Sequence, residues 1–480
     1  MTQTWDVIVV GGGTTGMPAA TFAAERGARV LVIDAAEDVG GTLHLSTGQL
    51  SAAETRLQDQ KGISDTKDAH YEDIMRISKN TADPTLVRLA VDNAADTFNW
   101  LQDNGFAPLD SHPVLGQAHE PYSERRYYWG VDGGVTILET LRGPFQTQVD
   151  AGQITVKLST EVTKLLTDAQ GAVVGVETSG PDGQQTEYGQ NVVLACGGYS
   201  SNGNMFEELN GFPQYYNGAY PHAQGAGIRL GQSVGGVLRG HDYYLCGYGA
   251  VLDKDTIPAG MTVRPIHHPT KRPIWEIHVN SRGERFVQED VDSVDVREHA
   301  LLKQPDLRRW VIYDDAIAQA SPPQFDGVTK DAEMAFFGSH PMFTKADTLE
   351  VLAQASGIDA AGLGASVAAY NDAIEKETPD PIGRQHRPLP IKQGPFYAIR
   401  VQGTSISSTV GLAVDADLRV IDKDNKPVAN LYAAGELLGS GQTMGDSFCG
   451  GMMATPALTF GRLLGQSLLT WEDRAAQAAE

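Results

Sequence analysis

Three glycines near the start of the chain have a spacing that suits phosphate binding. Gly11, Gly13 and Gly16 form a GxGxxG pattern between an apolar run at 6–10 and a helix-like segment at 17–26. The first glycine permits a tight turn, the second lets backbone N–H groups approach a pyrophosphate, and the third lets the helix pack closely on the strand. The pattern predicts a dinucleotide site at the start of a βαβ unit.

A second apolar run and two later turns extend this site. Residues 29–33 resemble a strand and are followed by Asp34, whose carboxylate can accept hydrogen bonds from a ribose. Gly40–Gly41 come soon after, and strand-to-glycine turns recur at 194–198 and 431–436. Because contacts of this kind suit an extended dinucleotide, the sequence favours FAD over NAD.

The remaining segments predict how these turns are positioned. Alternating apolar and polar residues at 153–179 indicate a β-meander, and 191–195 is typical of a buried strand. Residues 236–398 are richer in histidine, proline and aromatic residues, which predicts an inserted α+β cap domain for the substrate. The FAD-binding domain is then discontinuous, formed by 1–235 and 399–480, with an α/β Rossmann-like fold.

Composition narrows the range of partners. The 480-residue chain carries a net charge of −23, which disfavours nucleic acids and anionic membrane surfaces. Its three cysteines fit neither a disulfide framework nor a metal-type spacing. His267 and His268 would point to opposite sides of a strand, so no metal site is expected. Without a signal peptide or a run of membrane-spanning length, we expect a cytoplasmic protein with no membrane span. The oligomeric state stays open.

Six segments, taken in order, form a pattern that is more specific than any one of them. They read VIVVGGGTTGMPAA, GGTLHLSTGQLSAA, VVLACGGYSSN, VNSRGERFVQED, LYAAGELLGSG and GGMMATPALTFGRLLG. This set resembles the fumarate reductase and succinate dehydrogenase flavoprotein superfamily, which implies an FAD-dependent oxidoreductase acting on CH–CH groups. The cofactor-binding residues predicted from the motif and the resemblance are Gly11, Gly13, Gly16, Asp34, Gly40, Gly41, Thr42, Gly48, Val162, Ala195, Gly197, Gly435, Glu436, Gly451, Ala457 and Leu458.

Departures from the family pattern bear on the substrate. Fumarate reductases hold a dicarboxylate with a histidine before the late hairpin and an arginine before the final glycine pair. The matching stretches here, 403–410 and 446–451, contain neither residue. Because a buried dicarboxylate needs charge-assisted donors, fumarate and succinate are disfavoured. Residues 456–461 read PALTFG, which is similar to a segment of the 3-ketosteroid and cyclohexanone dehydrogenase branch.

That branch implies desaturation next to the carbonyl of a cyclic or steroid-like ketone, with hydride passing to flavin N5 and an external electron acceptor such as a quinone. In those enzymes a backbone N–H and a tyrosine hydroxyl polarise the ketone. Gly451 matches the N–H donor, whereas the tyrosine position falls on Ser447 or Phe448. Thr42 stands where membrane-complex members attach FAD through histidine, and His44 is displaced by two positions, so non-covalent FAD is expected.

Phenols next to arginines are the candidate proton acceptors. Residues 122–130 read YSERRYYWG. A tyrosine can take the α-proton if a neighbouring cation lowers its pKa, although packing is the favoured role for any single ring. His268 belongs to a His-Pro-Thr segment that resembles the family's substrate-side histidine. The predicted catalytic residues are Tyr127, Tyr128, Tyr122, Tyr244, His268, Ser447 and Gly451.

Two other functions remain open at the level of sequence. One is reduction of an unsaturated carboxylate other than fumarate, by the reverse chemistry of the same superfamily. The other is non-catalytic binding of FAD.

Overall fold

The computed structural model describes residues 4–116, 119–266 and 268–468, and these divide into two compact units. The cap predicted at 236–398 overlaps most of the second unit. The main segment of that unit, Cys246–Ile406, begins ten residues later and ends eight residues later than the predicted range. Unit 1 comprises Met1–Phe212, Ala219–Leu245 and Ser407–Glu480, and unit 2 comprises Pro213–Gly218 and Cys246–Ile406.

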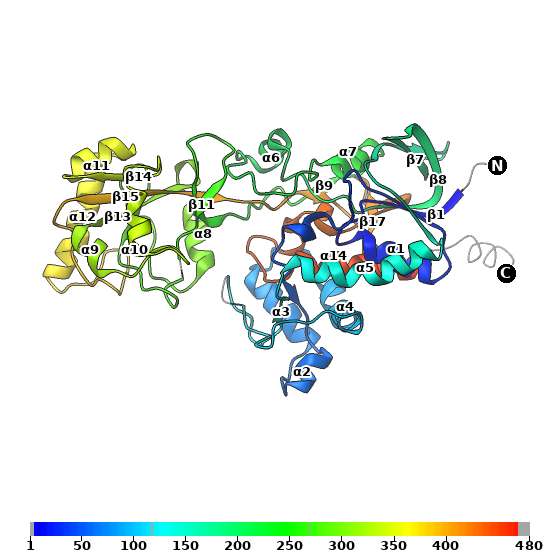
Figure 1. Ribbon diagram of the computed structural model, residues 1–480, viewed down its shortest axis with the longest axis horizontal. Coiled ribbons are helices and arrows are strands. Elements are labelled where there is room, and N and C mark those ends of the chain that lie inside the picture. The colour runs from blue at the N-terminus through cyan, green and yellow to red at the C-terminus, as the bar shows by residue number, and fades with distance from the viewer. Residues whose placement is uncertain (1–3, 117–118, 267, 469–480) are drawn as a thin grey trace. The chain divides into compact units, whose positions relative to one another are not determined.

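Unit 1 is built on a mixed sheet that has eight strands within the described residues (Figure 1). The order of its main path is β17-β18-β8-β1-β2-β5, and β6 and β7 continue from β8 as the predicted antiparallel meander. The strands are β1 (Thr4–Val10), β2 (Val30–Ile33), β5 (Ile154–Lys157), β6 (Glu161–Thr167), β7 (Val173–Gly180), β8 (Gly183–Leu194), β17 (Arg419–Ile421) and β18 (Pro427–Ala433). β1, β2, β5, β8 and β18 run parallel, and the continuous apolar runs of β1 and β2 reflect burial of both faces.

The C-terminal segment of the described chain returns to the N-terminal motif through helix packing. Helix α14 (Ala454–Ser467) packs against α1 (Gly16–Glu25), which also contacts α5 (Gly134–Asp150). Gly461 and Gly465 of α14 make the close approach possible. A Cβ on Gly461 would lie 2.3 Å from the Thr15 carbonyl oxygen, and one on Gly465 would lie 2.6 Å from the Ala19 carbonyl oxygen. The predicted final helix is therefore part of the nucleotide-binding core.

Shorter elements surround this core. The other helices of unit 1 are η1 (Gly41–His44), α2 (Arg56–Gln60), α3 (Lys67–Ile77), α4 (Pro84–Asp103), α6 (Gly203–Asn210), α7 (Ala226–Ser233), η3 (Gly435–Leu438) and α13 (Ser440–Thr443). Two small antiparallel ribbons pair β3 (Leu50–Ser51) with β4 (Tyr127–Tyr128) and β9 (Leu238–Arg239) with β16 (Gly411–Leu412).

Unit 2 has its own antiparallel sheet and core. Among the described residues the sheet has six strands in the order β11-β10-β15-β13-β12, with β14 also paired to β15. They are β10 (Gly247–Leu252), β11 (Met261–Val263), β12 (Ile277–Val279), β13 (Arg308–Asp314), β14 (Phe343–Ala346) and β15 (Phe396–Thr404). The helices are α8 (Val294–Leu302), η2 (Pro305–Leu307), α9 (Asp315–Ala320), α10 (Lys330–Ala335), α11 (Leu349–Ser356) and α12 (Ala360–Glu375). The predicted fold class, α/β with an inserted α+β unit, is confirmed.

Candidate functional site

Three glycine turns, far apart in the sequence, meet at the carboxyl end of the parallel strands. Gly11 follows β1, Gly197 follows β8 and Gly435 follows β18, and these three strands are neighbours in the sheet. A Cβ on Gly11 would lie 2.5 Å from the carbonyl oxygen of Ala195, and one on Gly435 would lie 2.4 Å from the Thr15 hydroxyl. The turns are thus in contact, at the edge where open α/β sheets bind ligands.

The glycines of the first turn have different surroundings. A Cβ on Gly16 would lie 1.8 Å from the Gly11 carbonyl oxygen, so Gly16 serves helix–strand packing. A Cβ on Gly13 would meet only the Gly40–Gly41 backbone, at 3.7 Å or more, and would fill the gap between two glycine turns. The N–H groups of residues 13–15 have no acceptor among the described residues, and α1 has no side-chain cap. This is a donor set suited to a pyrophosphate.

Asp34 connects this turn to the end of β2. Its carboxylate accepts a hydrogen bond from the Gly12 N–H at 2.7 Å and another from the Ala36 N–H at 2.8 Å. Burial raises the pKa of Asp34, while these two hydrogen bonds act in the opposite direction. Each carboxylate oxygen can accept a further hydrogen bond, so the side chain retains the acceptors that a ribose requires.

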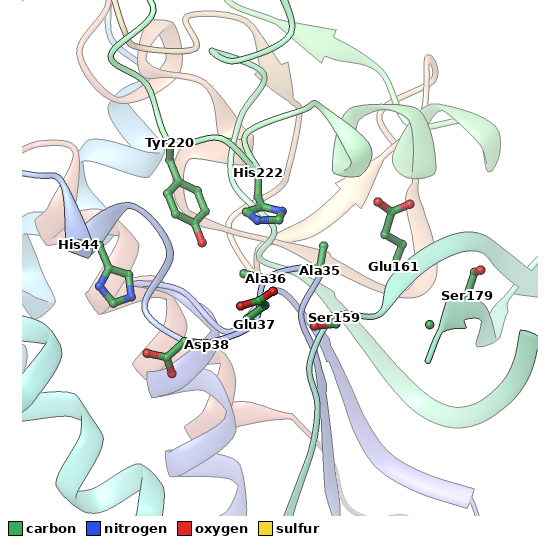
Figure 2. A pocket seen from close by; sticks show the side chains of 11 residues that line it. Ala35, Ala36, Glu37, Asp38, His44, Ser159, Glu161, Ser179, Tyr220 and His222 are labelled. Carbon is green, nitrogen blue, oxygen red and sulfur yellow. The ribbon is translucent and has the colours of Figure 1, made fainter. Parts of the chain in front are cut away.

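A cavity of about 690 Å³ opens beyond Asp34, next to the end of β2 (Figure 2). Three carboxylates, two imidazoles and one phenol are among the side chains that line it. An acidic lining suits ribose hydroxyls and repels phosphate groups. The cavity therefore has the chemistry expected at the adenosine end of an extended dinucleotide. Its lining residues are Ala35, Ala36, Glu37, Asp38, His44, Ser159, Glu161, Ser179, Gly180, Tyr220 and His222.

The segment around η1 bears on how the cofactor is held. His44 lines the acidic cavity, and its Nε2 lies 3.1 Å from the Val39 carbonyl oxygen (Figure 2). Thr42 lies within η1. Gly40 and Gly41, which start this segment, have φ values of 121° and 55°, a region of backbone space that favours glycine. Non-covalent attachment of FAD stays a prediction.

A further glycine turn, formed by Gly450 and Gly451 and named the second glycine turn, precedes α14 and is hydrogen-bonded to the β3–β4 ribbon through α14. Gly451 has a φ of 82°, and a Cβ on it would lie 2.4 Å from the Ser51 backbone nitrogen. The Thr455 hydroxyl accepts a hydrogen bond from the Ser51 N–H at 2.8 Å and donates one to the Ser51 carbonyl at 3.1 Å. Thr455 N–H in turn donates to the Gly451 carbonyl at 2.9 Å. Gly451 therefore contacts both Ser51 and Thr455, and two hydrogen bonds hold these two residues together.

The tyrosines of residues 122–128 surround this turn, each in a different way. The Tyr122 hydroxyl donates to the Gly450 carbonyl oxygen. The Tyr127 hydroxyl donates to Gln49 Oε1 at 2.6 Å, and its ring carbons would lie 3.1 Å from a Cβ on Gly450. Tyr128 packs on Phe98 and shares a 2.9 Å hydrogen bond with Thr55. Burial is the largest influence on all three phenols and raises the pKa of each. This is opposite in direction to the shift that a phenolate base requires.

A buried arginine fastens this segment to α3. Arg126 is fully buried and forms ion pairs of 2.6 Å with Asp65 and with Asp73. Asp73 also accepts hydrogen bonds from the backbone and the hydroxyl of Ser123, each at 2.7 Å. Arg126, one of the two arginines next to the candidate phenols, thus has its charge compensated by carboxylates.

The other predicted catalytic residues are dispersed. Tyr244 packs against Phe212, with ring centroids 4.8 Å apart, and Ser447 is almost fully buried. His268 belongs to unit 2, where its Nδ1 lies 2.7 Å from the Thr270 hydroxyl. Burial, followed by the charge of Arg297, lowers the pKa of His268. The adjacent His267 lies outside the described residues.

The remaining predicted cofactor residues lie in four places of unit 1. Glu436 accepts hydrogen bonds from the backbone and the hydroxyl of Ser408, at 3.1 and 3.0 Å, and burial raises its pKa. Gly48, with a φ of 60°, precedes β3. Val162 lies in β6 next to the cavity residue Glu161, and Ala457 and Leu458 are buried in α14.

Several residues of the site were not predicted from the sequence. Glu37 and Asp38 carry a detectable signal, because they follow the same strand end as Asp34. Tyr220 and His222 carry none, since they lie in a loop with no motif and reach the cavity only through the tertiary fold. Gln49, which binds Tyr127, was also missed.

Comparison with known proteins agrees with this geometry. Residues 6–452 match the family described as "FAD binding domain". A probable fumarate reductase, Ifc3, of Shewanella frigidimarina is 29% identical, with alignment over 97% of this chain and 75% of that protein. The 4-oxocyclohexanecarboxylate 2-dehydrogenase of Sinomonas cyclohexanicum is 25% identical over 99% and 96% of the two chains. The structure of 3-ketosteroid Δ1-dehydrogenase from Sterolibacterium denitrificans superposes with a TM-score of 0.74 at 20% identity. The match covers 97% of this chain and 99% of that one.

The chain belongs to the FAD binding domain family, within the fumarate reductase and succinate dehydrogenase flavoprotein superfamily. It is an FAD-dependent oxidoreductase of the group that acts on CH–CH bonds. The residues present fit FAD, because the unpartnered N–H groups before α1, the gap at Gly13 and the acidic cavity have the chemistry of its pyrophosphate and adenosine parts. Among helices of the described residues, none is long and apolar enough to cross a membrane.

Proposed function

We propose that this oxidoreductase desaturates a cyclic or steroid-like ketone between the α and β carbons. The proposal is supported chiefly by what occupies the two places where fumarate reductases carry cationic residues. Phe448 packs on the ring of His119, with centroids 4.1 Å apart, and Ser408 is hydrogen-bonded to the carboxyl group of Glu436. Phe448 and Ser408 have uncharged side chains and supply no guanidinium group to hold a dianion, which favours an uncharged carbonyl as the ligand.

The second glycine turn would polarise the carbonyl group of the ketone. The described residues contain no acceptor for the Gly451 N–H, which can therefore donate to the ketone oxygen as negative charge develops there. Tyr127 lies against Gly450, and its raised pKa keeps the phenol protonated. It would serve as a second donor by exchanging its hydrogen bond to Gln49 Oε1 for one to the ketone oxygen. It would take the part that the ketone dehydrogenase resemblance gives to a tyrosine at Ser447 or Phe448.

His268 is the proposed acceptor of the α-proton. Its lowered pKa keeps the imidazole neutral near pH 7. In the tautomer that donates Nδ1–H to the Thr270 hydroxyl, 2.7 Å away, Nε2 is the basic nitrogen. One C–H bond then breaks with its proton passing to Nε2, the other breaks with its electron pair leaving as hydride, and a C=C bond forms. Bound FAD supplies the hydride acceptor and passes two electrons to an external acceptor, for which a quinone is our proposal.

Reduction of an unsaturated carboxylate is the second candidate. It is favoured by the fumarate reductase relative and by a cationic group in unit 2. There the guanidinium groups of Arg309 and Arg297 lie 4.2 and 5.5 Å from the ring centre of Tyr248, and the charge of Arg297 also acts on His268. Such a group could receive a carboxylate.

Anaerobic flavin spectra separate the two functions. The FAD-loaded protein is mixed with cyclohexanone, 4-oxocyclohexanecarboxylate, a saturated 3-ketosteroid or succinate, without any nicotinamide nucleotide. We expect the ketones to bleach the flavin absorbance and succinate to leave it unchanged. In the His268→Gln variant, bleaching by ketones should slow by about 100-fold or more, as for loss of a general base. Bleaching by succinate alone, or reoxidation of dithionite-reduced enzyme by unsaturated acids but not by cyclic enones, would overturn desaturation in favour of the second candidate.

A further inference from the structure

The peptide between Gly450 and Gly451 is held on one side by a single buried hydroxyl. We propose that Tyr122 is a positioning residue, which fixes this peptide so that the Gly451 N–H is directed at the substrate's carbonyl oxygen. The inference rests on the proposed function, because it assumes that the N–H donates to an oxygen that becomes negatively charged. It gives Tyr122 a different role from that of a proton acceptor.

The geometry of the peptide bond connects the two groups. This peptide is not among the cis bonds of the described residues, so its C=O and N–H point in opposite directions. Since the Gly450 carbonyl oxygen accepts a hydrogen bond from Tyr122, the Gly451 N–H points away from that tyrosine. Any rotation of the peptide plane moves both groups together.

Two glycines in succession make this fixation necessary. A peptide flanked by residues without Cβ can rotate at small cost, because both sides can adopt positive and negative φ. The Gly451 side is restrained by its contact with Ser51 and by the hydrogen bond from Thr455 to its carbonyl. Neither contact acts on the Gly450 carbonyl. Among the described residues, the Tyr122 hydroxyl is the side-chain donor that selects one orientation.

Tyr122 is itself rigidly placed. Its ring meets the ring of His70 edge-on, with centroids 5.6 Å apart at 89°, and lies 6.3 Å from the ring of Tyr127. The guanidinium group of Arg126, already held by two carboxylates, is 5.4 Å from the ring centre. Tyr122 is 3% exposed, and burial raises its pKa, so the phenol stays a hydrogen-bond donor over the working pH range.

Phenol binding tests the direction of the N–H without turnover. A phenolate is a planar ring with a charged oxygen, like the enolate of a cyclic ketone, and its stacking on oxidised flavin is seen as a long-wavelength absorbance band. We would titrate FAD-loaded wild-type protein and Tyr122→Phe with para-substituted phenols of falling pKa, and with toluene, which has no oxygen. Tyr370→Phe is the matched control, because Tyr370 is fully buried in unit 2 and donates to the Leu389 carbonyl at 3.2 Å.

The expected result is a selective loss. Tyr122→Phe should bind phenolates about 10- to 100-fold more weakly, the effect of one misplaced hydrogen bond to a charged group, and should bind toluene as the wild type does. The dependence of affinity on phenol pKa should flatten, whereas Tyr370→Phe should keep the wild-type dependence. For a ketone substrate, kcat should fall more than KM changes, because the interaction strengthens in the transition state.

Two outcomes would overturn the inference. One is unchanged phenolate affinity in Tyr122→Phe. The other is an equal loss of phenolate and toluene binding, which would indicate a general collapse of the pocket. If Tyr122→Phe is not recovered folded, Tyr122→Met serves the same comparison.

Failure of the proposed function has a different signature. If no ketone bleaches wild-type flavin while Tyr122→Phe still loses phenolate selectively, desaturation is wrong and the positioning role stands. If ketones bleach the flavin of wild type and variant at equal rates, the proposed function stands and the positioning role is wrong.

Discussion

The two glycine turns of unit 1 precede helices that pack against each other, α1 and α14, yet different forces hold them in place. The turn before α1 has close partners nearby in sequence, with Gly16 against Gly11 and Asp34 at the end of the next strand, in addition to its contacts with the turns after β8 and β18. The turn before α14 is held by Ser51 and Tyr122, which are hundreds of residues away in the sequence, and by Thr455 of its own helix. Both end in N–H groups without acceptors among the described residues.

This difference explains why one turn has a recognisable sequence signature and the other has little. Local constraints require fixed spacings, which a pattern such as GxGxxG records. Long-range constraints require only that suitable side chains arrive from elsewhere. A family with one type of first turn can therefore alter its second turn, and with it the substrate, without altering how it binds FAD.

Removal of Arg126 should give the largest effect, because it removes the long-range support of the second turn. In Arg126→Met, Asp65 and Asp73 each lose an ion pair, while Asp73 keeps its 2.7 Å pair with Arg76, and we expect the free energy of unfolding to fall by about 3 kcal/mol. Arg88→Met is the matched control, since Arg88 also pairs with two aspartates, Asp68 and Asp92, but at the surface. There the loss should be below about 1 kcal/mol. Urea unfolding of both variants, followed by circular dichroism, measures the difference, and equal losses would contradict it.

The first turn offers a sharper pair of variants, with an effect of similar size. Gly16→Ala places a methyl group 1.8 Å from the Gly11 carbonyl oxygen, so we expect a loss of about 3 kcal/mol in stability, at the upper end for overpacking. Gly13→Ala has room for its methyl group and should keep wild-type stability. Its FAD affinity should nevertheless fall on the order of tenfold, as for a lost hydrogen bond to a charged group. Thermal unfolding and fluorescence titration with FAD measure the two effects, and a stable Gly16→Ala would refute the assignment.

These two turns also show how far the sequence could predict the structure. Strands β1 and β2 and the packing role of Gly16 were predictable, because the local spacing of residues determines them. Strand β8 was predicted at 191–195 but begins at Gly183, since its first half pairs with the meander and alternates instead of forming an apolar run. The carboxylate partners of Arg126 and the arrival of Tyr220 at the cavity were not predictable, because nothing in their local sequence specifies a distant partner.

Gly451→Ala should have a smaller effect on stability than Gly16→Ala. It combines a positive φ with a Cβ 2.4 Å from the Ser51 nitrogen. Gly62 is the control, because it has a φ of 65° but no atom within 4 Å of an added Cβ. Gly62→Ala should cost about 1 kcal/mol from the backbone alone, and Gly451→Ala about 1 kcal/mol more from overpacking. Ketone turnover should be lost only in Gly451→Ala. Equal stability of the two variants, measured by urea unfolding, would show that the β3–β4 ribbon shifts to make room for the added methyl group.

The smallest expected effect concerns pH and the packing behind Tyr122. His70 is fully buried, its ring nitrogens have no hydrogen-bond partner among the described residues, and burial, followed by the charge of Arg126, lowers its pKa to about 3. The unfolded chain binds a proton at His70 below about pH 6.5, whereas the folded chain does not until about pH 3. Stability contributed by neutral His70 is therefore lost as pH falls between these values, by at most about 1.4 kcal/mol per pH unit.

His70→Phe keeps a ring against Tyr122 and removes this titration. The loss of unfolding free energy between pH 7 and pH 5 should be about 1–2 kcal/mol smaller in the variant than in the wild type. The other histidines contribute equally to both proteins, so the difference isolates His70. An identical pH dependence would mean that His70 is protonated or solvated in the fold. The second turn would then rest on a solvated histidine, and the packing behind Tyr122 would be looser than the structure indicates.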